Sequence, residues 1–311
     1  MKPLVGISSC LLGNNVRYDG GHKLDRSLRD TLGTYVDYVP VCPEVECGMG
    51  VPREAMRLVD TGNGIRLMTR ETGIDMTEKM HAWMVERIDS LAALPLCGFI
   101  FKSRSPSSGL MRIKVYTDKG VRNDGMGIFA RGVTMRLPFL PVEDDGRLND
   151  DKLKENFIER VFVMHRWHKL LAEDRSLSAL INFHADHKYL LMAHCPKTLK
   201  ELGSLLAGGK HNVSIHEDYL ATLAPGLAKI ATARKNANVL QHIMGYFKKE
   251  LSADEKAELM EIITDYHRGL VPLIVPITML GHYVRRYRPE YLMRQVYLHP
   301  HQGELMLRNH V

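Results

Sequence analysis

The sequence predicts an α/β domain with a Rossmann-like, mainly parallel sheet, followed by an all-α helical domain. Short apolar runs alternate with helix-like segments over the first 140 residues, which is typical of an α/β layer. A turn-rich stretch follows, and beyond it apolar residues recur at helical spacing over long segments. A length of 311 residues also favours two domains, which we place at 1–145 and 146–311.

The first domain is predicted to contain four strands and one helix. Apolar or alternating runs predict strands at residues 3–7, 36–41, 96–101 and 111–116. The helix is expected at Met76–Leu91, because Asp75 precedes it and an apolar stripe runs along it. Pro141, a pair of aspartates and Gly146 then mark the boundary between the domains.

The second domain is predicted to be a helical bundle. Helical periodicity extends over Asn156–Leu171, Leu190–Leu206, Leu220–Met244 and Ala253–Leu270. Gly208-Gly209-Lys210 and Arg268-Gly269 are typical helix ends. The apolar stretch Leu270–Leu280 is short and contains two prolines, so we expect a buried helix there instead of a membrane span.

The composition excludes several classes of protein. No apolar run is long enough to cross a bilayer and no signal-peptide pattern is present, so we expect a cytoplasmic protein without a membrane or an obligate protein partner. Five cysteines in so long a chain do not form a disulfide scaffold. Residues 151–311 hold 22 Lys and Arg against 17 Asp and Glu, compared with 20 against 19 before them. This excess indicates either an anionic partner or simply a basic surface.

Three predicted strands end in loops that carry chemistry. Cys10 follows the first strand, Cys42 the second, and the polar segment Phe101–Gly109 the strand at 96–101. Ligands of α/β proteins bind at the carboxyl ends of parallel strands, so the three loops are expected to form one site. Both cysteines lie in tight turns, which favours metal ligation over simple packing.

The other cysteines are weaker candidates. Cys47 lies near the expected site and is as well explained as a bystander. Cys97 in a strand and Cys195 in a predicted helix are expected to be buried as small hydrophobic residues.

The motifs around these loops resemble the thiouracil desulfidase (TudS) family. The matching segments are Ser8–Gly13, Val16–Gly21, Val41–Gly48 with Val51–Arg53, and Lys102–Gly109. The second half is similar to the YbgA-type helical domain, through residues 187–194, 238–249, 272–276 and 295–301. The combination resembles enzymes that remove sulfur from 4-thiouridine in transfer RNA, and it covers nearly the whole chain.

This resemblance implies a [4Fe–4S] cluster held by three cysteines, with one iron left open for the sulfur of the substrate. The ligand positions carried over are Cys10, Cys42 and position 108, where this chain has Ser108 in place of the family's cysteine. A serine hydroxyl is a poor substitute for a thiolate on iron. Either the residue was altered to abolish the cluster, or Cys47 or Ser108 compensates, or the activity is lost; the otherwise intact motif favours alteration.

Glu44 and Ser105 are the expected catalytic residues. Exchange of a C=S sulfur for oxygen needs a water molecule, and a carboxylate near the open iron can activate it or transfer protons. Glu44 suits this role, although a carboxylate at a helix start also interacts with nearby N–H groups. Ser105 is placed to hydrogen-bond the pyrimidine, or else it only forms a turn.

Four further residues are expected to bind the substrate. Arg17, Asp19 and Lys102 are polar groups within the matched motifs, although Asp19 before two glycines equally suits a turn. Arg53 either contacts a phosphate or, as the preferred interpretation, is an ordinary surface cation.

The second domain is expected to bind the transfer RNA. Its cations are interleaved with aromatic residues, and such surfaces neutralise phosphates and stack on unpaired bases. The cations selected are Lys188, Lys248, Lys249, Arg285 and Arg286. The neighbouring pair Tyr246-Phe247 is expected in the helical core. The histidines of this half have no zinc-site spacing.

Two other functions remain open at this point. One is a desulfurase of free thiouracil-type bases, and the other is a non-enzymatic nucleic-acid-binding or repair-associated protein whose α/β half is structural.

Overall fold

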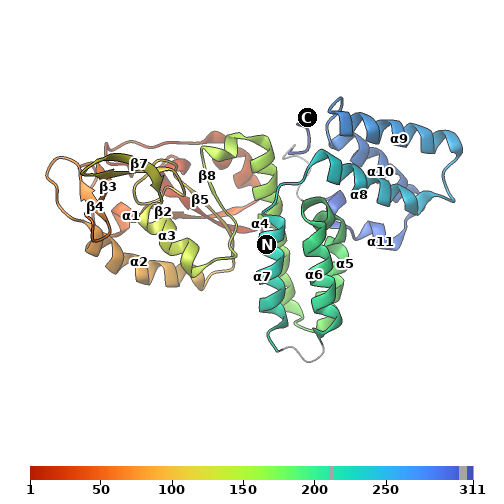
Figure 1. Cartoon of the computed structure of the whole chain (residues 1–311), viewed down its shortest axis with the longest axis horizontal. Coiled ribbons are helices and arrows are strands. Elements are labelled where there is room, and N and C mark those ends of the chain that lie inside the picture. Colours follow the sequence, from red (N-terminus) through yellow and green to blue (C-terminus); the bar gives the residue numbers. More distant parts are fainter. Residues whose placement is uncertain (210–212, 301–306, 311) are drawn as a thin grey trace. The chain divides into compact units, whose positions relative to one another are not determined.

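The structure, a computed structural model, describes residues 1–209, 213–300 and 307–310, so the predictions for Lys210 and His301 lie outside the described residues. The chain divides into two units, Met1–Asn149 and Asp150–Val311. The first contains a parallel sheet with helices and the second is mostly helical, which confirms the predicted fold class (Figure 1).

A four-stranded parallel sheet organises the first unit. Its strands are β1 (Leu4–Ser8), β2 (Asp37–Val41), β5 (Leu96–Phe101) and β8 (Val142–Asp144), in the order β2-β1-β5-β8. Every neighbouring pair is parallel. All four carboxyl ends therefore lie at one edge of the sheet, where the chain leaves it in loops.

A second sheet, which the sequence did not predict, lies in the same unit. It contains β3 (Met56–Asp60), β4 (Ile65–Thr69), β6 (Ile113–Thr117) and β7 (Gly120–Gly125), in the order β4-β3-β6-β7. The β3–β4 and β6–β7 pairs are antiparallel and β3–β6 is parallel. The predicted strand at 111–116 belongs to this sheet. Strand β7 was missed because glycine, asparagine and aspartate fill most of it, whereas β3 and β4 are mainly apolar five-residue runs that the sequence analysis did not assign.

The core of the first unit lies between the parallel sheet and two helices. These are α2 (Thr77–Ala92), found where a helix was predicted, and α3 (Ile128–Arg136). The ring of Phe99 stacks on Phe101 at a centroid distance of 4.3 Å, and Phe129 from α3 meets both rings edge-on. Gly6 on β1 must lack a side chain, because a Cβ atom there would overlap the ring of Phe99.

The second unit consists of helices. They are α4 (Asp151–Glu173), α5 (Leu177–His194), α6 (Pro196–Ala207), α7 (Ile215–Leu227), α8 (Ala233–Met244), α9 (Ala253–Arg268), α10 (Ile274–Tyr287) and α11 (Glu290–Met293). Gly269 ends α9 in the left-handed conformation, as expected for a helix stop. None of the helices in the described part of the chain combines the length and apolar character that a membrane span needs.

Two long predicted helices of this unit are each broken in the structure. The segment 190–206 is interrupted at Cys195, which is extended because Pro196 disfavours a helical residue before it. The segment 220–244 is interrupted after Leu227, and Thr232 caps the next helix by accepting from Lys235 N. Apolar periodicity continued through both breaks and therefore concealed them.

The structure also contains several short helical turns. They are α1 (Pro43–Glu46), the 3-10 segments Ser9–Leu12, Leu32–Thr34, Arg147–Asn149, Gly245–Phe247 and Val296–Leu298, and a π turn at Ser27–Thr31.

Candidate functional site

The three predicted loops leave the same edge of the parallel sheet. Cys10 lies in the 3-10 turn that directly follows β1, and Cys42 is the residue before α1 at the end of β2. The serine-rich loop follows β5, which pairs with β1 on the side opposite β2. The parallel topology therefore brings the loops to one edge, as the sequence predicted.

Glu44 connects two of these loops. Its Oε2 lies 3.4 Å from the Sγ of Cys42, and its Oε1 accepts a hydrogen bond from the hydroxyl of Ser107. The guanidinium of Arg53 lies 3.7 Å from the same carboxylate. Only 12% of the Glu44 side chain and 11% of the Arg53 side chain are exposed, so this ion pair is largely shielded from water.

The position of Arg53 contradicts the preferred interpretation of a surface cation. Its Nη2 donates to the backbone oxygen of Val16 at 3.0 Å, in addition to facing Glu44. The residue thus fastens the loop after β1 to the loop after β2. Because Val16 is distant in sequence and Glu44 lies in the preceding helical turn, nothing in the pattern around Arg53 indicated this burial.

Burial keeps the two thiols of the site protonated. It raises the pKa of Cys10 to about 11 and that of Cys42 to about 12, and the Glu44 carboxylate also raises both. The cations Lys102 and Arg17 act on Cys10 in the opposite direction. One carboxylate therefore influences both sulfur atoms, and any metal bound here must displace their protons.

The serine-rich loop is held in place by its own hydroxyls and by α3. Ser105 Oγ lies 2.9 Å from Ser107 Oγ and accepts from the N–H of Ser108 at 3.1 Å. The backbone oxygen of Ser107 accepts from Phe129 N, and that of Gly109 from Gly127 N. Ser107 and Ser108 are buried. Ser105 therefore does form a turn, and its hydroxyl remains beside the hydroxyl that donates to Glu44.

Lys102 is positioned by a strand end that the sequence analysis missed. Its Nζ lies 2.7 Å from Asp145 Oδ2, and the other oxygen of Asp145 accepts from Ser103 N at 2.6 Å. The N–H of Lys102 donates to Ser8 Oγ at the end of β1. Asp145 directly follows β8, so the fourth strand of the sheet also contributes to the site. Two consecutive aspartates near a proline and a glycine had indicated only a turn.

Arg17 and Asp19 lie in a more open part of the site. They form an ion pair at 3.4 Å, and Asp19 Oδ1 accepts from Gly21 N in a turn. This hydrogen bond lowers the pKa of Asp19. The turn alternative for Asp19 thus matches its geometry, while Arg17 is close enough to affect Cys10.

The side chains that could hold a metal are two thiols and one hydroxyl. Cys10, Cys42 and Ser108 occupy the three loops, whereas Cys47 packs in an apolar cluster with Met49 and donates to the Glu44 backbone oxygen. Within residues 1–209, 213–300 and 307–310, no group of three His, Cys, Asp or Glu side chains is arranged to hold a metal ion. Ser108 thus leaves the site one thiol short of the three that the resemblance implies.

The remaining cysteines differ from each other. Cys97 is buried in β5, as expected. Cys195 is not inside a helix but precedes α6, where Lys229 Nζ lies 3.4 Å from its sulfur. Although burial raises the pKa of this thiol, hydrogen bonds from Thr198 and Lys229 lower it to about 7.

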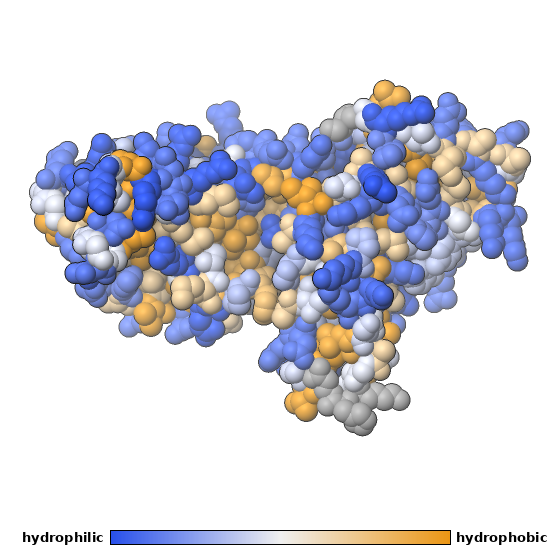
Figure 2. Space-filling model, in the orientation of Figure 1, coloured by the Kyte–Doolittle hydropathy of each residue, from blue (hydrophilic) through white to orange (hydrophobic). Residues whose placement is uncertain are grey.

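The predicted RNA-binding cations of the second unit lie on three segments, of which α5 carries Lys188. Lys248 and Lys249 are exposed after the turn that follows α8, and Arg285 and Arg286 are exposed in the last turn of α10. Hydrophilic side chains cover much of the helical unit on the face seen in Figure 2.

Lys188 belongs to a cluster of three tyrosines. Its Nζ lies 5.6 Å from the ring centre of Tyr189 and 6.0 Å from that of Tyr291. Tyr246 stacks on Tyr291 at 5.8 Å and is 43% exposed. The expectation that Tyr246-Phe247 lies in the core is therefore correct for the buried Phe247 and wrong for Tyr246.

Comparison with known proteins finds relatives for both halves. The family model described as 2-thiouracil desulfurase matches residues 5–145, and the model described as a protein of unknown function, DUF1722, matches residues 188–302. The chain is 27% identical over 153 residues to the uncharacterized protein YbgA of Escherichia coli (strain K12), covering 48% of this chain and 90% of that protein.

Two further similarities concern about half of the chain. The uncharacterized protein YbbK of Bacillus subtilis (strain 168) is 28% identical over 152 residues, covering 47% of this chain and 99% of that protein. A solved chain described as the [4Fe-4S]-dependent thiouracil desulfidase TudS is 28% identical, with a TM-score of 0.38, and the match covers 48% of this chain and 95% of that one.

Proposed function

We propose that the protein is built to desulfurise 4-thiouridine in transfer RNA to uridine. The reason is that residues 5–145 form a 2-thiouracil desulfurase family domain, which is followed by a DUF1722 (YbgA-like) domain. The observation that carries the proposal is the position of Glu44. Its buried carboxylate lies against the thiol of Cys42 and the hydroxyl of Ser107, at the edge where three loops meet.

The protein's own side chains supply the polar groups that this reaction needs. Glu44 accepts a proton from the attacking water or returns one to the leaving sulfur. The partly exposed hydroxyl of Ser105 orients the pyrimidine, and the buried hydroxyl of Ser107 holds the Glu44 carboxylate in place. Lys102, fixed by Asp145, lies close enough to Cys10 to affect its thiol, and its positive charge would stabilise negative charge that develops on a departing sulfur at this edge.

An iron–sulfur cluster fits the donor set only in part. Cys10 and Cys42 would each supply a thiolate, and a thiophilic Lewis-acidic iron would stabilise the departing sulfide. At the third position Ser108 supplies a hydroxyl, which favours a cluster-deficient protein as the chain stands.

Exchange of Ser108 for cysteine tests the proposal. The Ser108→Cys variant, purified without oxygen, is expected to bind iron and inorganic sulfide in equal amounts and to release sulfide from thiolated transfer RNA. The unaltered chain and Cys97→Ser in the Ser108→Cys background serve as controls, because Cys97 is buried in β5 away from the loops. A variant without iron, or one whose iron is unaffected by Cys10→Ser, would contradict the three-loop site.

The substrate is tested separately. Thiolated transfer RNA and free thiouracil are offered to the loaded variant, and equal turnover of the free base would favour the small-molecule alternative. Binding without any turnover would instead favour a nucleic-acid-binding protein with a structural α/β half.

The exposed lysine pair after α8 provides the test for the RNA surface. Lys248/Lys249→Ala is expected to weaken transfer RNA binding, with iron content unchanged. The number of phosphate contacts inferred from the salt dependence of binding should fall by about one to two. The matched control is Lys197/Lys200→Ala on α6, which removes two exposed lysines elsewhere on the unit. Equal losses in both variants would mean that only net charge matters.

A further inference from the structure

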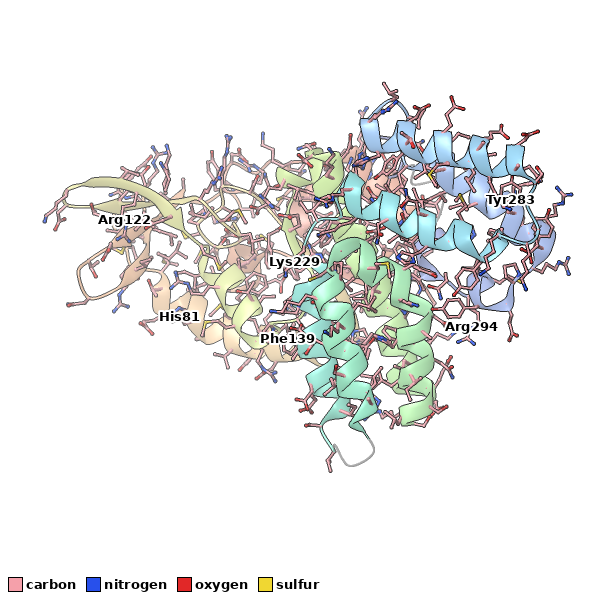
Figure 3. All side chains as sticks on the ribbon, turned by 45° about the vertical axis from the view of Figure 1, so that its right-hand side comes forward. His81, Arg122, Phe139, Lys229, Tyr283 and Arg294 are labelled. Atoms are coloured by element: carbon pink, nitrogen blue, oxygen red, sulfur yellow. The ribbon has the colours of Figure 1, made fainter. Side chains whose placement is uncertain are left out.

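The helical unit contains a cavity whose lining includes none of the predicted RNA-binding cations. Its volume is about 440 Å³, within the range of small-molecule sites. The lining comes from the start of α4, the end of α5, the α7–α8 connection, the end of α9 with the residues after it, and the side chains of Tyr297, Arg308 and His310. Figure 3 labels Lys229 in the α7–α8 connection, next in sequence to the lining residue Ile230. All of these residues belong to the second unit, so the cavity is independent of the three-loop site.

One part of the cavity wall is a buried ion network. Arg308, which is 5% exposed, donates to Glu155 Oε1 at 3.2 Å and to Glu159 Oε1 at 2.8 Å. The second oxygen of Glu159 lies 3.0 Å from His194 Nε2, and that of Glu155 lies 2.8 Å from His310 Nε2. Arg308 offsets one of the two negative charges of Glu155 and Glu159, and each carboxylate also lies against a histidine ring. The wall therefore presents at most one net negative charge to a ligand, fewer than the two lining cations Lys152 and Arg268.

The other charged lining side chains are the cations Lys152 and Arg268, whereas the lining residues Asn156, Thr232 and Asn236 each carry both a donor and an acceptor. Lys152, His267 and Arg268 are exposed, and no ion pair joins any of them to another side chain in the part of the chain that the structure describes. The hydroxyl of Tyr266 accepts from Asn236 Nδ2 at 3.0 Å and therefore keeps its proton for donation. Cationic and hydroxyl donors on one cavity favour an anionic ligand.

The rest of the lining is apolar. It includes Leu190, Ala193, Ile230, Val271 and Leu273. A bare inorganic anion would leave this surface uncovered and most of the volume empty. A neutral ring compound would fill the volume but leave the rim cations unpaired. The ligand that satisfies both parts carries an anionic head and a planar, weakly polar body.

We infer that the cavity binds a mononucleotide unit, either as a free nucleoside monophosphate or as the phosphorylated end of an RNA. The phosphate contacts Lys152 and Arg268 at the rim, and the base lies against the apolar wall beside Tyr266. Both sources share this chemistry, and the experiment below distinguishes them.

Calorimetric titration of the full chain with uridine monophosphate, uridine and inorganic phosphate tests the inference. Uridine monophosphate is expected to bind more tightly than either of its parts. Lys152→Gln/Arg268→Gln is expected to weaken its binding by about tenfold or more, since two charge-assisted contacts are removed. Lys200→Gln, which removes an exposed cation from α6 outside the lining, is the matched control and is expected to change nothing.

A second variant tests the cavity without changing charge. Ala231→Trp fills the lining at the α7–α8 connection and is expected to abolish binding, with folding checked by circular dichroism. If that variant does not fold, the charge variant alone decides, because its residues are exposed.

Short RNAs with and without a terminal phosphate separate the two sources. Binding of the phosphorylated RNA alone, with loss in Lys152→Gln/Arg268→Gln, identifies an RNA end; binding of uridine monophosphate identifies a free nucleotide. The inference is overturned if neither binds, if uridine or phosphate binds as tightly as the nucleotide, or if the charge variant binds as the control does. Sulfide release by the Ser108→Cys protein is a separate measurement, so failure of one proposal leaves the other standing.

Discussion

Removal of the Asp145 carboxylate is expected to destabilise the first unit by about 3 kcal/mol. The carboxylate accepts from Lys102 Nζ at 2.7 Å and from Ser103 N at 2.6 Å, and its side chain is 15% exposed. Although burial raises the pKa of Asp145, these two hydrogen bonds lower it further than burial raises it. The contacts therefore favour the charged form, and the folded state is the one that provides them.

The magnitude follows from the type and burial of these contacts. A hydrogen bond to a charged group contributes about 1.5–3 kcal/mol, and removing one partner of a buried ion pair costs about 3–5 kcal/mol. Because Asp145 and Lys102 are 15% and 18% exposed, Asp145→Ala belongs at the lower end of that range. Asp145→Asn keeps an oxygen for Ser103 N and should lose about half as much. The control is Asp89→Ala, whose partner Arg136 is 58% exposed and whose cost should stay below about 0.5 kcal/mol.

Urea unfolding can measure this for the first unit alone. The chain has two tryptophans, Trp83 in the first unit and Trp167 in the second, so Trp167→Phe in every background leaves fluorescence from the first unit only. The stabilisation by Asp145 should be present above the ordinary carboxyl pKa of 3.8 and should disappear as the pH falls through its lowered value. A loss in Asp145→Ala no larger than in Asp89→Ala would refute the role of this carboxylate.

Further predictions concern other positions. Gly127→Ala should cost the first unit about 1–3 kcal/mol in the same experiment, because a Cβ atom there would overlap the backbone oxygen of Ser107. Gly203→Ala on α6 meets no atom within 4 Å and should stabilise the second unit by up to about 1 kcal/mol, which Trp167 fluorescence measures in chains that keep this residue. Cys195 should titrate with a midpoint near its pKa of about 7 in ultraviolet absorbance of the thiolate, and Lys229→Gln should raise that midpoint; an unchanged midpoint would mean that Lys229 does not stabilise the thiolate.

The sequence predicted those parts of the fold in which local pattern and tertiary position agree. Strands β1, β2 and β5 are apolar and end in distinct turns, so both their positions and their shared edge could be inferred. Strand β8 has only three residues, two of them acidic, and becomes a strand only by pairing with Phe99–Phe101. A pairing partner more than 40 residues away leaves no mark on so short a segment, and Asp145 was missed with it.

The same distinction applies within the site. The serine loop and the two cysteine turns could be located because each directly follows an apolar strand of the parallel sheet at its carboxyl end. Arg53 looked like a surface cation because its burial depends on Val16 in another loop and on Glu44 in α1. Tyr246 and Phe247 are adjacent, yet one is exposed and the other buried, because the 3-10 turn there directs neighbouring side chains to different environments.

The surroundings of position 108 make its exchange a test of ligand chemistry and not of folding. The N–H of Ser108 is fixed by Ser105 Oγ, and the flanking backbone is bonded to the start of α3. The hydrogen bond that fixes residue 108 is donated by its backbone N–H, so replacing the hydroxyl oxygen by sulfur keeps this contact. The cysteine would therefore enter a loop that is already ordered, at the sheet edge that also carries two thiols whose protons burial retains. If iron is still not taken up, the fault lies in the proposed convergence of the loops, because neither the fold nor the supply of thiols would then be lacking.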